Sequence, residues 1–156
     1  MSEPVQLTHV VAVNAYVYRN GRFLLLKRNT EPKIWGPPGG RLHRNEDPLA
    51  GLCREVKEET GLEVEVLAPA NTWFGQWKNE YFLLAIDYLV RICGGTVRLS
   101  GEHSDFAWVT LDELQEGEPV RLQPGVGFRL EDFRNAQRLY DSCIKFAHFS
   151  SGNDAL

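Results

Sequence analysis

One segment near the middle of the chain carries both the start and the stop signals of a helix. Pro48 suits a first helical turn, and either Asp47 or Asn45 can cap it. Gly61 suits the left-handed residue that ends a helix. Between these limits the apolar residues recur at helical spacing, at Leu49, Leu52, Cys53 and Val56. A helix with one apolar side must be covered on that side, so we expect this side to pack on a sheet.

Strand-like sequence surrounds the predicted helix. Residues 9–19 and 22–28 predict a hairpin, because Asn20-Gly21 between them is a strong turn signal. A loop rich in Pro and Gly follows at residues 29–40. Further strands are expected at residues 62–67, 72–77, 81–92, 96–99 and 105–109.

Two more helices are expected near the end of the chain. Thr110 and Glu113 have capping-box spacing, which predicts a short helix that starts at Leu111. Residues 130–149 have helical periodicity. The order of strands, helix, strands and helices predicts an α/β fold, a mixed central sheet with helices packed on it.

Length and charge limit the other possibilities. The 156 residues are about one domain long, so we expect a single domain over residues 1–156, with a core at about 8–149 and a flexible tail at 150–156. The net charge of −4 argues against a nucleic-acid partner. The chain shows no signal-peptide pattern and no apolar run of about 20 residues, so no membrane partner is expected. Three unpaired cysteines suit a reducing compartment, and a cytoplasmic location is expected.

Three carboxylates crowd one face of the predicted helix. Glu55, Glu58 and Glu59 are spaced i, i+3, i+4, which places like charges side by side at a cost in helix stability. Gly51 inside the same helix lowers its stability further. Taken alone, three glutamates favour a solvated acidic face, although such a cluster also suits a hard divalent cation.

The residues around these glutamates reverse that preference. Gly40 is followed after five residues by Glu46, and after seven more by the run from Arg54 to Leu62, REVKEETGL. This pattern resembles the Nudix box, G-x5-E-x7-R-E-U-x-E-E-x-G-U with U bulky and apolar, at every specified position. At average residue frequencies, a chance match at one start point is about 10⁻⁹ or rarer. The resemblance implies a Nudix-type α/β/α sandwich that cleaves a nucleoside diphosphate linked to a group X, with Mg²⁺ or Mn²⁺ as cofactor.

The same resemblance implies roles for individual residues. The expected metal ligands are Gly39, through its carbonyl, with Glu55, Glu58 and Glu59. Glu55 and Glu58 are also expected to serve the catalytic step, Glu55 by orienting the attacking water. Arg54 is expected to hold the glutamates in place by ion pairs, and Glu46 to tie the loop to the helix.

The loop between the predicted strands at residues 96–99 and 105–109 offers two further candidates, Glu102 and His103. Many family members supply a carboxylate or a histidine from this region, and GDP-mannose-type members place a histidine base similarly ahead of a Trp, here Trp108. Glu102 is therefore expected as a supplementary metal ligand and His103 as a general base. The alternative is an ordinary polar surface loop.

Substrate contacts are predicted at Arg28, Trp35 and Arg41. Arg28 ends a predicted strand and Arg41 flanks the catalytic loop, so each can reach a phosphate, although solvent exposure is the alternative for both. Trp35 is a candidate for stacking on a base, with packing under the Pro-Gly loop as the favoured alternative. The aromatic residues at 73, 74 and 77 raise the same choice between a base pocket and ordinary core, and core is favoured.

The leading hypothesis for function is hydrolysis of a (deoxy)nucleoside triphosphate or an oxidised nucleotide, a small-molecule substrate. A nucleotide sugar of the GDP-mannose type is the alternative within the same chemistry. A non-catalytic nucleotide sensor is the alternative of another class, but sensors in the family usually have an eroded box, and here every carboxylate is present. Family members are often dimers, so a homodimer is possible.

Overall fold

The computed structural model describes residues 8–151. Its elements follow one another along the chain as β1 (Val10–Arg19), β2 (Arg22–Arg28), β3 (Trp35–Gly36), β4 (Gly39–Arg41), α1 (Pro48–Thr60), β5 (Glu63–Trp77), β6 (Tyr81–Gly94), β7 (His103–Val109), α2 (Leu111–Glu116) and α3 (Leu130–Ser151). The expected tail differs at its start, because residues 150 and 151 still belong to α3. The rest of that tail, residues 152–156, lies outside the described residues.

The strands form one mixed sheet in the order β3-β2-β1-β6-β5, with β4 paired to β1 and β7 paired to β2. β1 and β6 run parallel in the middle, and the other pairs are antiparallel. The prediction of a mixed central sheet is therefore confirmed. The two strands expected within residues 62–77 are one continuous strand, β5, which makes a long hairpin with β6.

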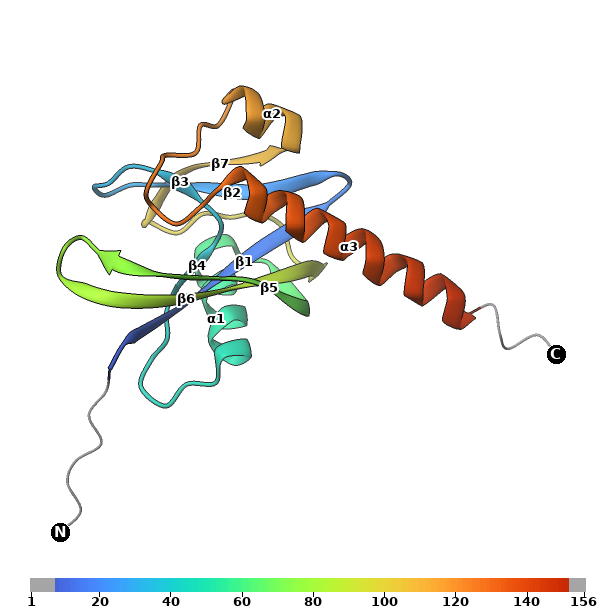
Figure 1. The fold of residues 1–156 in the computed structure, drawn as a ribbon, viewed down its shortest axis with the longest axis horizontal. Helices are drawn as coiled ribbons and strands as arrows, with labels where there is room; N and C mark the ends of the chain where they lie inside the picture. Colours follow the sequence, from blue (N-terminus) through green and yellow to red (C-terminus); the bar gives the residue numbers. More distant parts are fainter. Residues whose placement is uncertain (1–7, 152–156) are drawn as a thin grey trace, which may run out of the picture.

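Helices cover the sheet on both faces, as Figure 1 shows. Alternate residues of β1 face opposite ways: Val13 and Val17 join the core beneath α1, whereas Tyr16 and Tyr18 join the core beneath α3. Leu52 and Val56 of α1 complete the first core. Phe133 and Ala136 of α3, with Leu114 of α2, complete the second. The α/β/α sandwich expected from the sequence is the observed architecture.

α1 begins and ends where its sequence signals indicate. The Asp47 carboxylate accepts a hydrogen bond from the Ala50 amide at 3.0 Å, so Asp47 rather than Asn45 is the cap. Gly61 ends the helix in the left-handed region, at φ 73°. Leu49, in the first turn, is 46% exposed and takes little part in the core that was expected to include it.

The segment expected as a strand at residues 96–99 is irregular, and it takes its hydrogen bonds from α1 instead. The Arg98 amide donates to the Thr60 carbonyl at 2.7 Å, and the Ser100 amide donates to the Glu59 carbonyl at 3.2 Å. The last carbonyls of a helix have no partner within the helix, so this segment satisfies them. It thereby carries the residues that follow it to the end of α1. Among the described residues, no helix is both long and apolar enough to span a bilayer.

Candidate active site

Arg54 is the centre of an ion-pair network on the side of α1 that faces the cavity. Its Nε and one terminal nitrogen bind the two carboxylate oxygens of Glu46 at 2.7 and 2.8 Å. Its other terminal nitrogen binds Glu55 at 2.9 Å and Glu58 at 3.1 Å. The guanidinium lowers the pKa of Glu46 to about 2, mainly through these hydrogen bonds. An ionised Glu46 thus orients Arg54, and Arg54 in turn holds two carboxylates of the helix.

Glu59 points the other way, into the protein, and is only 5% exposed. Its carboxylate accepts a hydrogen bond from the Gly39 amide at 2.9 Å. Burial, together with the nearby charges of Glu55 and Glu102, raises the pKa of Glu59 to about 8. Burial also raises the pKa of Glu55. Burial and mutual repulsion disfavour the ionised form of these carboxylates. A bound cation would stabilise them as anions.

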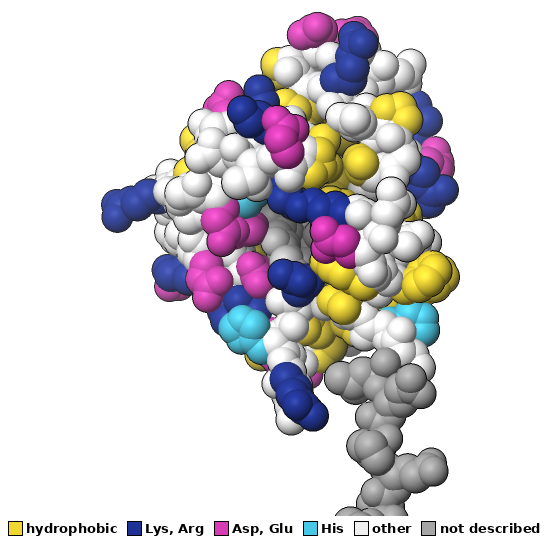
Figure 2. Space-filling model, turned by 90° about the vertical axis from the view of Figure 1, so that its left-hand side faces the viewer, with side chains coloured by type: hydrophobic (Ala, Val, Ile, Leu, Met, Phe, Trp, Pro, Cys, Tyr) yellow, Lys and Arg dark blue, Asp and Glu magenta, His cyan; other side chains and the backbone are white. Residues whose placement is uncertain are grey.

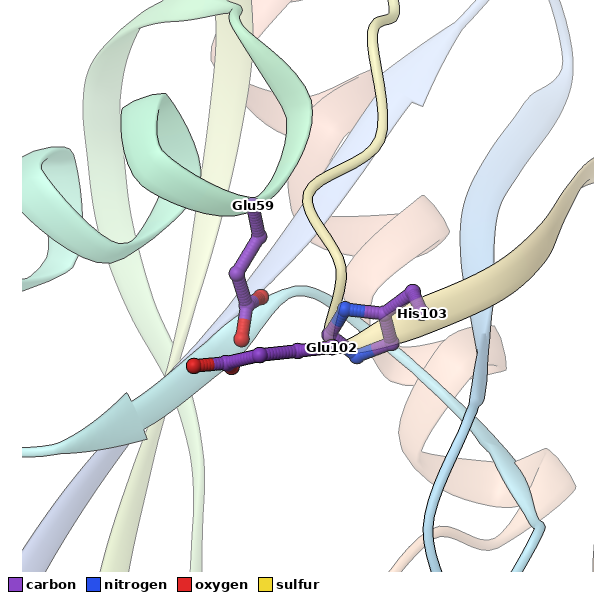
Figure 3. A group of neighbouring side chains, drawn as sticks. All are labelled: Glu59, Glu102 and His103. Carbon is purple, nitrogen blue, oxygen red and sulfur yellow. The ribbon is translucent and has the colours of Figure 1, made fainter.

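Two side chains at the start of β7 meet Glu59, as Figure 3 shows: Glu102, directly before the strand, and His103, its first residue. The ligand atoms of Glu59, Glu102 and His103 all lie within 4.8 Å of one another. The backbone of residues 100–102 is held from both sides. The Ser100 amide binds the end of α1, and the Asn29 amide donates to the Glu102 carbonyl at 2.9 Å. The cluster therefore depends on contacts between α1, the end of β2 and the start of β7.

The side chain of His103 is half-buried beside the cavity. The residue pairs with Arg28 across β2 and β7, and its Nδ1 is buried without a hydrogen-bond partner in the described part of the chain. Burial lowers the pKa of His103, so its ring is neutral near pH 7. A neutral imidazole offers one unprotonated nitrogen to a metal ion or to a reacting water.

The donor set fits a divalent cation. Two carboxylates and an imidazole suit Mn²⁺ directly, and carboxylates with added water suit Mg²⁺. Gly40 allows the neighbouring loop to approach closely, because a Cβ there would lie 2.6 Å from the Glu55 carboxyl carbon. The Gly39 peptide lies beside Glu59 through the hydrogen bond of its amide.

This cluster opens into a cavity of about 980 Å³. Figure 2 shows acidic side chains gathered beside a hollow that basic side chains also border. The cavity walls include the carboxylates of Glu55, Glu58, Glu59 and Glu102. They also include the aromatic residues Trp73, Trp77, Tyr81 and Phe128. A space of this size, with charged groups at one part and aromatic rings at another, suits a ligand that is part anion and part flat ring.

A family model for the NUDIX domain matches residues 8–126. The chain belongs to the Nudix hydrolase family. Nudix hydrolases act on phosphorus-containing acid anhydrides and generally use divalent metal ions. The resemblance seen in the box is therefore confirmed across most of the chain.

Individual relatives agree with the family assignment. The chain is 36% identical over 121 residues to a MutT-like protein of Streptomyces ambofaciens. The aligned region covers 74% of this chain and 76% of that protein. It is 32% identical over 122 residues to the Mycobacterium tuberculosis protein named "Putative 8-oxo-dGTP diphosphatase 2", with 76% and 85% covered. The crystal structure of a MutT Nudix hydrolase from Burkholderia pseudomallei superimposes with a TM-score of 0.70 at 27% identity, and covers 83% of this chain and 98% of that one.

The structure brings some of the predicted Nudix site residues together and separates others. Glu59, Glu102 and His103 converge, whereas Glu58 is held by Arg54 and its side chain is 59% exposed. Arg28 and Arg41 both line the cavity, and Arg41 is exposed. Their individual roles, and the role of Gly39, stay predictions.

Trp35 is the exception among the predicted substrate contacts, because the structure places it away from the cavity lining. It pairs with Lys27, while its neighbour Gly36 pairs with Leu26 and lines the cavity. Successive residues of a strand face opposite sides, so the Trp35 ring packs into the core beneath α3 instead. The favoured alternative for Trp35, packing, is what the structure shows.

Several cavity residues of this Nudix fold were missed from the sequence or assigned to the core. Trp73 and Trp77 line the cavity, whereas Phe74 between them faces away and is 57% exposed. Asp87 also lines the cavity although only 1% of its surface is exposed. The available signal was a single acidic residue within the apolar run FLLAIDYLV. An unpaired charge is rare in a buried strand, so such a residue marks a polar site.

Proposed function

We propose that this Nudix hydrolase cleaves (deoxy)nucleoside triphosphates, including oxidised ones, to a nucleoside monophosphate and pyrophosphate, with Mg²⁺ or Mn²⁺ as cofactor. One observation carries the proposal. The cluster of Glu59, Glu102 and His103 shares its cavity with the guanidinium groups of Arg28 and Arg41, besides that of Arg54. Neither Arg28 nor Arg41 forms an ion pair with any carboxylate in residues 8–151.

The metal site uses the carboxylates that the fold brings to the end of α1. The proposed ligands are the Gly39 carbonyl with Glu55, Glu58, Glu59 and Glu102. A bound divalent ion would neutralise phosphate charge and lower the pKa of the attacking water. Arg54 contributes by holding Glu55 and Glu58 at fixed positions on the helix. Arg54 and Glu46 thus act through the glutamates rather than on the substrate.

The proton of the attacking water is assigned to His103, with Glu55 orienting the water. A general base must be unprotonated at the working pH, and burial meets this condition for His103 by lowering its pKa. The water oxygen forms a bond to the α phosphorus, and the oxygen that bridges the α and β phosphates leaves with its electron pair as part of pyrophosphate. The leaving pyrophosphate carries more negative charge than a sugar phosphate does.

Arg28 and Arg41 are the residues proposed to bind that charge. Arg28 lies over the Trp77 ring at 5.7 Å, and Arg41 lies over the Tyr81 ring at 5.7 Å. A cation–π contact restrains each guanidinium and leaves N–H groups free to bind phosphate oxygens, although one nitrogen of Arg28 also donates to Thr30. The Nε of Arg28 is buried without a partner in the described part of the chain, so a ligand oxygen would satisfy it.

Product analysis on a nucleotide panel tests the proposal. The purified protein is incubated with nucleoside triphosphates, oxidised triphosphates, nucleotide sugars, ADP-ribose and dinucleoside polyphosphates, with Mg²⁺, Mn²⁺ or EDTA, and the products are separated by ion-exchange chromatography. We expect monophosphate and pyrophosphate from triphosphates only when a metal ion is present. Release of a sugar phosphate as the faster reaction would favour the nucleotide-sugar alternative.

Matched glutamine variants test the assignment of residues. Glu58→Gln and Glu59→Gln are each expected to lose most of the activity while the protein stays folded. Glu63→Gln is the control, since Glu63 is an exposed carboxylate of β5 that pairs with Lys57 outside the cavity. A Glu59→Gln variant as active as Glu63→Gln would contradict the proposed site. No metal-dependent turnover on any substrate of the panel would favour the sensor alternative.

A further inference from the structure

The tip of the β5–β6 hairpin carries two aromatic rings on one rung of its ladder. Trp77, the last residue of β5, pairs directly with Tyr81, the first residue of β6, and residues 78–80 form the turn between them. Directly paired residues of antiparallel strands point to the same face of a sheet, and both of these residues line the cavity. Both rings also pack on the small core cluster of Ala12, Leu83 and Ala85. This packing fixes the two rings relative to the sheet.

Each ring meets a guanidinium group that comes from another part of the fold. Arg28 ends β2, and its Cζ lies 5.7 Å from the centre of the Trp77 ring. Arg41 ends β4, and its Cζ lies 5.7 Å from the centre of the Tyr81 ring. Arg28 is also next to the cluster at the end of α1, because it pairs with His103. Two arginines from separate strands thus converge on two adjacent rings beside the carboxylates.

Aromatic partners are a notable choice for these arginines in a cavity with several carboxylates. Within residues 8–151, neither Arg28 nor Arg41 forms an ion pair with an acidic side chain. A carboxylate would also hold a guanidinium in place, but its negative charge would offset the positive charge. An aromatic face attracts a cation through its quadrupole and carries no net charge. The two rings can therefore restrain the arginines and leave their positive charge for an anionic ligand.

Restraint before binding favours the binding of an anion. A free arginine side chain has many rotamers, and ordering it when a ligand arrives lowers the affinity. Arg28 keeps its place although its Nε is buried without a hydrogen-bond partner in the described part of the chain. An unsatisfied buried donor costs stability, so other contacts must hold this side chain. The Trp77 ring supplies one of them, besides the hydrogen bond from Arg28 to Thr30.

We propose that Trp77 and Tyr81 are positioning residues, which hold Arg28 and Arg41 as a pair of unneutralised charges for the pyrophosphate part of the substrate. This inference rests on the proposed function for the phosphate-binding role of the two arginines. The rings act through the arginines, so their contribution does not depend on the base of the substrate. The effect should therefore be visible with a ligand that has no base.

Binding of inorganic pyrophosphate in the presence of Mg²⁺ tests the inference. Isothermal titration calorimetry compares the wild type with Trp77→Leu and Tyr81→Leu, which keep an apolar side chain but remove the ring. We expect each leucine variant to bind pyrophosphate about threefold to tenfold more weakly, the factor that corresponds to ordering one long side chain on binding. Trp77→Phe and Tyr81→Phe keep an aromatic face and should stay within about twofold of the wild type. Equal affinity of the wild type and both leucine variants would overturn the proposal.

A matched control excludes a general effect of aromatic side chains on the hairpin. Phe74 lies on the same strand as Trp77, is 57% exposed and is not among the residues that line the cavity. Phe74→Leu is therefore expected to bind pyrophosphate as the wild type does. A loss in Phe74→Leu as large as the loss in Trp77→Leu would contradict the assignment.

Double-variant cycles show whether each ring acts through its arginine. Arg28→Met removes the charge, so Trp77→Leu should cause no further loss of pyrophosphate affinity in that background. The same is expected of Tyr81→Leu in the Arg41→Met background. Loss by the same factor in both backgrounds would show a merely structural role of the ring and would refute the assignment. If Trp77→Leu does not fold, the cycle of Tyr81 with Arg41 decides.

The two proposals can fail separately. Pyrophosphate affinity that Arg28→Met and Arg41→Met leave unchanged would disprove the positioning role, whereas metal-dependent hydrolysis of triphosphates would still establish the function. Coupled losses of pyrophosphate affinity in a protein that hydrolyses no nucleotide would disprove the function and leave the positioning role standing.

Discussion

Replacing Glu59 by glutamine should inactivate the enzyme and at the same time stabilise the metal-free protein. Glutamine has the same shape, and its side-chain oxygen can still accept the hydrogen bond from the Gly39 amide. Its amide nitrogen can donate to Glu102, whereas the native carboxylate repels it. The change thus removes a buried negative charge without opening a cavity.

The pKa of Glu59 sets the size of the effect. Below pH 4.5 the side chain is protonated in both the folded and the unfolded state and contributes nothing. As the pH rises toward 8, the unfolded state releases this proton while the folded state keeps it, so the free energy of unfolding falls. A rise in the pKa from 4.5 to about 8 corresponds to a loss of up to roughly 5 kcal/mol at pH 8 and above.

Chemical denaturation in EDTA at pH 5, 6, 7 and 8 measures the effect, followed by the fluorescence of the four tryptophans. We expect Glu59→Gln and the wild type to be nearly equal at pH 5, and the variant to be more stable by several kcal/mol at pH 8. Glu58→Gln is the matched control, since its side chain is 59% exposed and a surface change of this kind is worth about 0.5 kcal/mol or less.

A Glu59→Gln variant that is equal to or less stable than the wild type at pH 8 would refute this reasoning. That result would mean that the ionised Glu59 carboxylate makes stabilising contacts in the folded protein. Repulsion from Glu55 and Glu102 would then not destabilise the fold. Activity must fall in the same variant by at least about a hundredfold, because metal ions supply several kcal/mol of transition-state stabilisation.

Other changes probe neighbouring parts of the structure. Mg²⁺ should raise the free energy of unfolding of the wild type by about 3 kcal/mol at a hundred times its Kd, and should have little effect on Glu59→Gln, as thermal melts will show. Arg54→Lys should lower kcat/KM about tenfold or more in a pyrophosphate-release assay, because an ammonium group cannot bind Glu46 through two parallel hydrogen bonds. Leu52→Ala should cost about 2 to 5 kcal/mol in urea unfolding, since Leu52 is fully buried between α1 and the sheet. Gly61→Ala should cost about 1 kcal/mol or more in the same measurement, because the φ of 73° disfavours a Cβ.

Local signals predicted α1 well because they act within a few residues. Asp47 caps the helix through the Ala50 amide, and Gly61 ends it, so both limits depend on neighbours in the sequence. The ion pairs of Arg54 with Glu46 and Glu58 also follow from the loop and one helical turn. The box therefore carries most of the information about its own geometry.

The cluster around Glu59 required contacts that no local pattern encodes. Residues 96–99 read as a strand, but the free carbonyls at the end of α1 bind the Arg98 and Ser100 amides instead. This competition between a strand ladder and a helix end brings Glu102 and His103 to Glu59. The sequence placed both residues among the candidates through the family resemblance alone, and packing explains why they meet Glu59 rather than Glu58.

The cavity is built from two sets of elements. The carboxylates are fixed by α1 and the segments bound to its end, whereas the wall around Asp87 is built by β1, β5, β6 and the loop before α3. Asn14 connects the two sets, because it binds Asp87 and pairs with Gly39, whose amide holds Glu59. Substitution of Asn14 by alanine should consequently lower turnover as well as substrate binding, and separate measurement of kcat and kcat/KM in this variant distinguishes the two effects.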